Sequence, residues 1–186
     1  MKKMKVTPYI TLLACFAIVF ASCKKTETFD NSWKISNEQQ FEKIANDPSY
    51  TRIISKSGKG FIMYKELKKG EDKSKSPYFT DQVKVLYSGW YKKDWEKDDI
   101  LTTDDGNVFH NKTIFLPQGD AHNIPRVLSI SSYKTIDGLK TALQHMHVGD
   151  KWEIWIPSEL AYGAYEQNNI RGYTTVVFEV ELLEIL

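Results

Sequence analysis

The sequence predicts an α+β domain in which a strongly twisted antiparallel β-sheet wraps around one short α-helix. Alternating apolar residues indicate strands, most clearly at residues 83–91, 152–156 and 174–183. Between the first and the second of these strands in sequence order, residues 136–146 carry an apolar stripe at helical spacing, which indicates the helix. Hydrophobic residues make up 41% of the chain and aromatic residues 13%, so a packed core can form.

The first 22 residues are interpreted as a signal peptide of the lipoprotein type. A lysine-rich start precedes an apolar run at residues 10–20, which is too short to span a bilayer. Small residues then stand directly before Cys23, as at a bacterial lipoprotein processing site. We therefore expect cleavage before Cys23 and lipidation of this residue. The alternative is an ordinary secretory signal followed by an unmodified cysteine.

Residues 23–58 are predicted to form a tether and a short helical extension ahead of a main domain at residues 59–186. Ser36 and Gln39 fit a capping box, and apolar residues follow at helical spacing. The Asn-Asp-Pro sequence at residues 46–48 is a typical stop signal. The extension should therefore hold one helix over about residues 37–46.

The main domain should begin with strands at residues 61–67 and 83–91. In the second strand Val83, Val85 and Tyr87 share one face by the period of two. The acidic stretch that follows lacks the Asp-x-Asp-x-Asp-Gly spacing of a calcium loop. We expect next a hydrophilic loop at 92–107, a short strand at 108–109, an insertion at 111–125 and a strand at 126–130.

The helix at residues 136–146 should be followed by a strand that places Trp152, Ile154 and Ile156 on one face. A last strand, residues 174–183, closes the sheet with alternate apolar residues facing inward. The space between the helix and the concave face of the sheet then becomes a pocket.

Charge and cysteine content exclude several kinds of chemistry. The formal net charge of +1 gives no indication of a nucleic-acid partner. Of the two cysteines, Cys15 leaves with the signal peptide and Cys23 would carry lipid, so no thiol remains for catalysis or metal binding. We expect neither a metal nor a cofactor, and a site made of shape, apolar surface and a few hydrogen-bond donors.

Two segments near the carboxyl terminus carry a family resemblance. Residues 156–164 read Ile-Pro-Ser-Glu-Leu-Ala-Tyr-Gly-Ala, and residues 176–183 read Val-Val-Phe-Glu-Val-Glu-Leu-Leu. In this order and spacing they resemble the signature of FKBP-type peptidyl-prolyl cis-trans isomerases. The resemblance extends over about residues 61–186, and it implies the fold, the pocket and the reaction of that family.

On this resemblance, four aromatic residues would form the catalytic pocket: Tyr162, Phe178, Tyr87 and Phe109. The Tyr162 hydroxyl would donate to the substrate carbonyl, and the backbone N–H of Ile136 would be a second donor. The residues expected to contact substrate are Ile136, Leu139, His110, Val127, Ile170 and Ala161.

Two positions depart from the family's pattern. Leu139 stands where the family has a large aromatic residue, usually tryptophan, on the pocket floor. His110 stands where an aspartate is usual. We expect these changes to alter the substrate preference.

The resemblance implies a prolyl isomerase that assists the folding of exported proteins. Its partners would be proline-containing segments of those proteins, and it would contact the membrane through a lipid anchor only. The folded domain should lie outside the cytoplasm, in the periplasm or at the cell surface. The alternative is a catalytically weak FKBP-like chaperone or protein-binding module of the cell envelope.

Overall fold

The computed structural model describes residues 31–186 apart from 72–73, 104–105 and 117–123. Residues Ser32–Leu186 form one compact unit. The expected signal peptide at residues 1–22 and the expected lipidation site at Cys23 lie outside the described residues.

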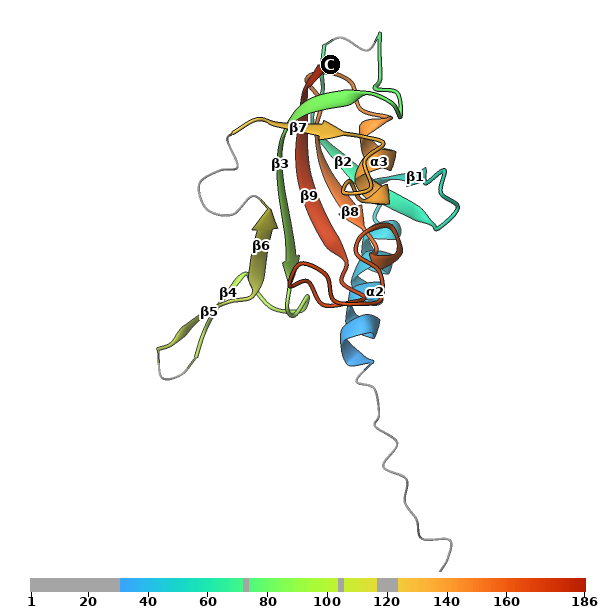
Figure 1. The fold of residues 1–186 in the computed structure, drawn as a ribbon. Helices are drawn as coiled ribbons and strands as arrows, with labels where there is room; N and C mark the ends of the chain where they lie inside the picture. The colour runs from blue at the N-terminus through green and yellow to red at the C-terminus, as the bar shows by residue number, and fades with distance from the viewer. Residues whose placement is uncertain (1–30, 72–73, 104–105, 117–123) are drawn as a thin grey trace, which may run out of the picture. The chain divides into compact units, whose positions relative to one another are not determined.

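The described strands form a twisted antiparallel sheet with helix α3 on one face (Figure 1). The strand order is β1-β2-β8-β9-β3-β6, β7 also pairs with β3, and β4 and β5 form a separate hairpin. This architecture confirms the predicted α+β fold with an amino-terminal helical extension. In chain order the elements are α2 (Ser32–Ala45), β1 (Thr51–Ile54), β2 (Phe61–Lys68), β3 (Gln82–Lys92), β4 (Ile100–Thr102), β5 (Val108–His110), β6 (Lys112–Leu116), β7 (Arg126–Ser129), α3 (Asp137–Leu143), β8 (Lys151–Ile156), the 3₁₀ turn η2 (Ser158–Leu160) and β9 (Val176–Ile185).

The inner core lies between α3 and the sheet. Leu139 and Leu143 of α3 pack against the inward residues of β8 and β9, including Ile154 and Phe178. Gly138 lets the helix approach closely, because a Cβ at this position would overlap the side chain of Ile156. The helix is shorter than expected, since the regular turns end at Leu143 rather than at residue 146.

The outer core lies on the opposite face of the sheet, beneath α2. Phe41 packs there with Met63, Trp155 and Val177, and Trp90 and Trp95 close its edge. Trp155 follows the inward Ile154 in sequence and so points outward, yet the helix leaves it only 6% exposed. Both faces of the central strands are therefore buried at this end of the sheet.

The start of α2 corrects the capping-box prediction. The helix begins at Ser32, so Ser36 is an interior residue rather than the N-cap. Contacts distant in sequence stabilise the additional turn: the Trp33 indole N–H donates to the carbonyl of Gly172 at 3.1 Å, and its ring meets Tyr91 edge-on. Asn37, 1% exposed, lies in the middle of these contacts.

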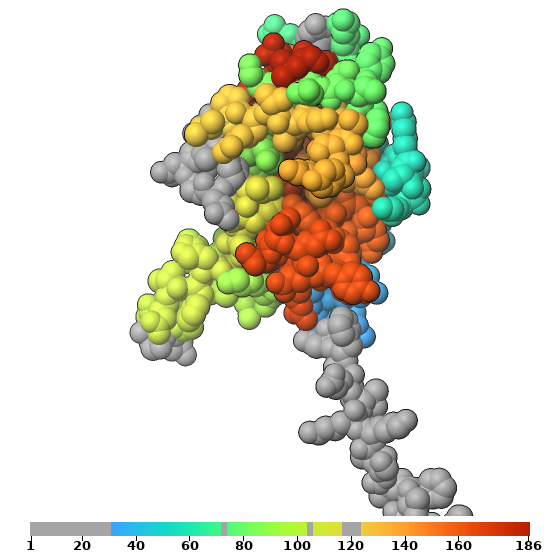
Figure 2. Space-filling view, in the orientation of Figure 1, coloured from blue at the N-terminus to red at the C-terminus, as the bar shows by residue number. Residues whose placement is uncertain are grey.

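Two further elements differ from the sequence-based expectation. The first strand of the sheet, β1, pairs with β2 from Thr51 onward, ahead of the boundary expected at residue 59. The stretch expected to be a loop at residues 92–107 contains β4, which pairs with β5 in a hairpin that projects from the rest of the unit (Figures 1 and 2). Four of the six paired residues are apolar, namely Ile100, Leu101, Val108 and Phe109, but no third described strand extends this small sheet.

We expect Asn37→Ala to lower the free energy of unfolding by about 2–3 kcal/mol, because it removes a buried amide with several partners. The Asn37 side-chain oxygen accepts from Thr175 N–H at 2.9 Å and from the Trp95 indole at 3.1 Å, and its amide donates to the Trp33 carbonyl. Chemical denaturation measures the change. Asn46→Ala, an exposed asparagine after the same helix, is the control and should cost under about 1 kcal/mol.

Candidate active site

Four aromatic rings meet at the inner face of the sheet. They belong to Tyr87 on β3, Phe115 on β6, Phe178 on β9 and Tyr162 after η2. Phe178 lies 5.6 Å from Phe115 and 6.4 Å from Tyr87 between ring centroids, and Phe115 lies 6.0 Å from Tyr162. The two Phe115 contacts are edge-to-face, a favoured geometry for aromatic pairs. The arrangement forms one continuous aromatic wall.

Gly89 makes room for this wall. It lies opposite Phe178 in the pairing of β3 with β9. A Cβ at Gly89 would lie 2.8 Å from ring atoms of both Phe115 and Phe178. Since any side chain would displace one ring, the glycine fixes the distance between the two phenylalanines.

Tyr162 is held by the turn that follows η2. Gly163 has φ +78°, in the left-handed region that glycine adopts without strain. Its N–H donates to the Ser158 carbonyl, and its own carbonyl accepts from Tyr173 N–H, both at 2.8 Å. The Tyr162 ring is thereby fixed against Phe115.

Burial raises the pKa of Tyr162 to about 12, and the nearby Tyr87 adds to the effect. A tyrosine hydroxyl is protonated at neutral pH even at its ordinary pKa of 10.0, and the raised pKa of Tyr162 extends the protonated range into alkaline pH. The hydroxyl can therefore donate a hydrogen bond. Among the described residues no side chain or backbone group hydrogen-bonds to it. It is thus available to a ligand carbonyl.

A groove of about 590 Å³ lies beside Tyr162. Ile136 and Ala161, two of the residues expected to contact substrate, line it together with Tyr162. Figure 2 shows the segment before α3 and the turn after η2 on the same face of the molecule. Charged side chains complete the lining, namely Lys59, Lys134, Asp137, Lys140 and Glu159.

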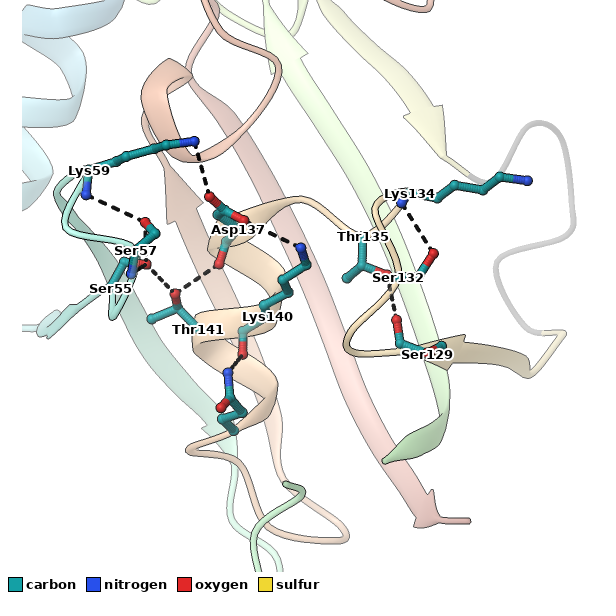
Figure 3. Close-up of polar contacts among 11 residues, drawn as sticks. Ser55, Ser57, Lys59, Ser129, Ser132, Lys134, Thr135, Asp137, Lys140 and Thr141 are labelled. Carbon is teal, nitrogen blue, oxygen red and sulfur yellow. Dashed lines mark hydrogen bonds and ion pairs between the residues drawn. The ribbon is translucent and has the colours of Figure 1, made fainter. Parts of the chain in front are cut away.

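Ile136 is positioned by contacts on both sides. It is the N-cap of α3 with extended backbone, φ −65° and ψ 150°. Before it, the Thr135 hydroxyl donates to the Ser129 carbonyl at 2.8 Å (Figure 3). After it, the Asp137 carboxylate forms ion pairs with the ammonium groups of Lys59, at 3.5 Å, and of Lys140, at 3.4 Å. These contacts hold the entry of the helix against β7 and against the turn between β1 and β2.

Leu139 and Ile170 lie beneath the aromatic wall. Leu139 is 6% exposed and Ile170 1%, and both belong to the inner core that contains Phe178. Ile136, Ala161 and Tyr162 pack against the same core. Both are thus buried core residues, and neither is among the side chains that line the groove beside Tyr162.

The chain matches the family model of FKBP-type peptidyl-prolyl cis-trans isomerases over residues 73–183. That range contains all four rings of the aromatic wall. The chain belongs to this family. The FKBP-type 22 kDa peptidyl-prolyl cis-trans isomerase of Escherichia coli K12 is 38% identical over 111 residues, which are 59% of this chain and 44% of that protein.

Other members of the FKBP-type family agree in sequence and in fold. FkpA of Aeromonas hydrophila is 32% identical over 59% of this chain and 33% of its own length. The crystal structure of FkpA from Escherichia coli superposes with a TM-score of 0.57 at 25% identity, covering 99% of this chain and 74% of that chain. A peptidyl-prolyl isomerase structure from Pseudomonas syringae gives a TM-score of 0.56 over 83% of this chain and 94% of its own. The matched regions span less than half the length of the first curated relative.

Phe109 is not a pocket residue in this FKBP-type chain, which corrects the sequence-based expectation. It lies on β5 opposite Leu101 in the projecting hairpin, and it is 55% exposed. His110 is exposed on the same strand, and Val127 is exposed on β7. The insertion of β4 and β5 shifts the sheet-forming strand along the sequence, so β6 supplies Phe115 where Phe109 was expected.

Sequence reasoning missed Phe115. The sequence-based expectation at residues 111–125 is an insertion. In the structure β6 pairs with β3 from Lys112 to Leu116. Ile114, Phe115 and Leu116 are residue types that favour strands. The short strand signal at 108–109 matched the family pattern and concealed the true partner of β3. Strand-forming residues occur twice within ten residues, at 108–109 and at 114–116. This repetition is the sequence feature that could have indicated an inserted hairpin before the strand that pairs with β3.

No metal-binding group of three or more His, Cys, Asp or Glu side chains occurs among the described residues. Within the same residues no helix has the length and apolar character needed to cross a membrane. The site combines the aromatic wall with a groove that is lined by Tyr162, by apolar residues and by charged side chains.

We expect Gly89→Ala to reduce catalytic efficiency, because the new methyl group forces Phe115 or Phe178 out of place at a cost of about 1–3 kcal/mol. The measurement is kcat/KM for a prolyl peptide, together with the midpoint of thermal unfolding. Ser88→Ala, on the neighbouring residue that points to the other face, should leave both quantities unchanged.

Proposed function

We propose that this chain is a peptidyl-prolyl cis-trans isomerase that acts at the wall formed by Tyr87, Phe115, Phe178 and Tyr162. The observation that carries the proposal is the half-buried Tyr162, whose hydroxyl lies at the edge of this wall and beside a groove open to a polypeptide. The match to the FKBP-type family supports it.

The reaction needs no nucleophile, acid or base. Rotation about an X–Pro bond faces a barrier of about 18–20 kcal/mol, because the amide loses resonance as it twists. The twisted amide is less polar than the planar one, so an apolar aromatic surface favours it relative to the ground state. The Tyr162 hydroxyl and the Ile136 N–H can hold substrate carbonyls and fix the geometry.

The proposed substrates are proline-containing segments of exported proteins. Support comes from the sequence, where a basic start, an apolar run and small residues before Cys23 suit a lipoprotein signal. In this proposal the isomerase domain lies outside the cytoplasm and a lipid on Cys23 holds it to the cell envelope. Metabolic labelling with a palmitate analogue tests the anchor, and loss of label in Cys23→Ser is the expected result.

A second candidate function is the holding of unfolded chains. The β4–β5 hairpin exposes Ile100, Val108 and Phe109 by 55–59% each. A well-folded sample that suppresses aggregation of an unfolded protein but shows no prolyl turnover would favour this function over catalysis.

We expect Tyr162→Phe to lower kcat/KM about two- to tenfold, the equivalent of one lost hydrogen bond of about 0.5–1.5 kcal/mol. Tyr165→Phe, at a tyrosine that is 82% exposed, is the matched control and should behave as wild type. Equal activity of Tyr162→Phe and wild type would exclude the hydroxyl as a donor to substrate.

The same variant tests the pKa. The Tyr162 pKa is raised from 10.0 to about 12, so the folded protein binds the proton more tightly than the unfolded chain. The associated stability is complete below pH 10 and is lost as the pH rises toward 12. In an alkaline titration of tyrosinate absorbance, Tyr162→Phe should therefore remove a late transition and leave the transitions near pH 10 in place.

We expect Phe115→Leu to reduce kcat/KM about two- to tenfold, because two edge-to-face ring contacts are lost. Phe109→Leu should leave kcat/KM unchanged, since that ring is exposed on the hairpin. Both are measured by the cis-to-trans isomerisation of one X–Pro peptide. The reverse order of effects would show that Phe109 lines the pocket.

A further inference from the structure

A second groove, of about 250 Å³, adjoins the groove beside Tyr162. Lys59 and Glu159 line both, so the two grooves meet at these residues. The second groove runs between α2 and the turn that joins β1 to β2. Its lining consists of Glu38, Phe41, Glu42, Lys59, Gly60, Phe61, Pro157, Ser158, Glu159, Tyr173 and Thr175.

The surface of this groove combines an apolar base with an acidic rim. Phe41, Phe61 and Pro157 contribute apolar surface, and the rings of Phe41 and Phe61 lie 5.4 Å apart. Three carboxylates line the groove, on Glu38, Glu42 and Glu159, against one ammonium group, on Lys59. The lining residues therefore carry a negative charge excess. The Arg52 guanidinium lies over the Phe61 ring, 3.9 Å from its centroid, so part of the aromatic base already contacts a cation.

The ion pairs of the rim leave two carboxylates uncompensated. Lys59 is directed to Asp137 at 3.5 Å, and Lys34 lies 3.6 Å from Glu38. In Figure 3 the Lys59 side chain reaches toward Asp137 at the start of α3. Among the described residues, no cation lies within 4.0 Å of Glu42 or Glu159, and Glu42 accepts only from the neutral Asn46 amide.

This combination fits a long basic side chain. Lysine and arginine carry an apolar stem and a charged head, so the stem can cover the aromatic base while the head meets the carboxylates at the rim. A neutral apolar residue would contact the apolar base but would form no ion pair with the carboxylates of the rim. An acidic residue would be repelled by these carboxylates. The volume is large enough for one such side chain and too small for a folded partner.

We propose that the groove binds a lysine or arginine of the same polypeptide whose proline is at Tyr162. The inference rests on the proposed isomerase function, and it adds a substrate preference for basic residues near the proline. Because Lys59 and Glu159 line both grooves, a bound polypeptide can pass over these two residues from one groove into the other. An extended chain advances roughly 3.3 Å per residue, so a basic residue two to five residues from the proline lies roughly 7–16 Å from it, and the test covers this range.

The test measures binding and turnover with the full chain and three sets of proline peptides. They carry lysine, norleucine or glutamate at two to five residues from the proline, on the amino-terminal side in one series and on the carboxyl-terminal side in the other. In one of the series, the lysine peptides should bind about two- to fivefold more tightly than norleucine peptides, as judged by fluorescence anisotropy, with glutamate weakest. Because the charges are near the surface, added salt should reduce the difference.

Charge-neutral variants locate the effect. Glu42→Gln and Glu159→Gln should each reduce the preference for lysine, and together they should abolish it. Turnover of a short peptide without a basic residue should stay at the wild-type value in Glu42→Gln. Glu66→Gln removes an equal charge from an exposed position of β2 outside both grooves, so the preference should remain.

Equal binding of lysine, norleucine and glutamate peptides in both series would overturn the inference. So would a lysine preference that survives the double variant. Absence of turnover for every peptide would instead contradict the proposed isomerase function. In that case the anisotropy comparison still decides whether the groove selects basic residues, because it does not depend on catalysis.

Discussion

The alternation of side chains along β9 is the constraint on which the rest of the structure depends. Phe178 faces inward and forms the centre of the aromatic wall, while the preceding Val177 faces outward beneath α2. One central strand thus carries both cores. A shift of its register by one residue would exchange the two faces and place the aromatic wall under the helix.

The proposed catalytic surface follows from this strand and from its two neighbours. β3 supplies Tyr87 and the space at Gly89, and the edge strand β6 supplies Phe115. The turn after η2 adds the half-buried Tyr162, whose hydroxyl is protonated at neutral pH and, with its raised pKa, stays so into the alkaline range. A rigid apolar wall with one hydrogen-bond donor is what the twisting of a prolyl amide requires, and it makes no demand on titratable groups at neutral pH.

Helix α2 has a structural role and a proposed functional one. Its inner side covers the outer core through Phe41, and the Asn37 amide fixes it to Thr175 and Trp95. Its exposed Glu42 contributes to the acidic rim of the second groove. Docking this extension on the sheet therefore creates a surface beside the prolyl groove that β1 to β9 alone would not provide.

The fold class, the helix that became α3 and the inward faces of β8 and β9 were predictable from the sequence, because they depend on local periodicity. The roles proposed for Tyr162 and Phe178 rest instead on the resemblance of residues 156–164 and 176–183 to the FKBP-type signature. Only the tertiary structure decided which phenylalanine completes the wall, because Phe109 and Phe115 both have strand signals and pairing with β3 distinguishes them. It also decided where α2 begins, since Trp33 and Asn37 find their partners more than fifty residues away in the chain.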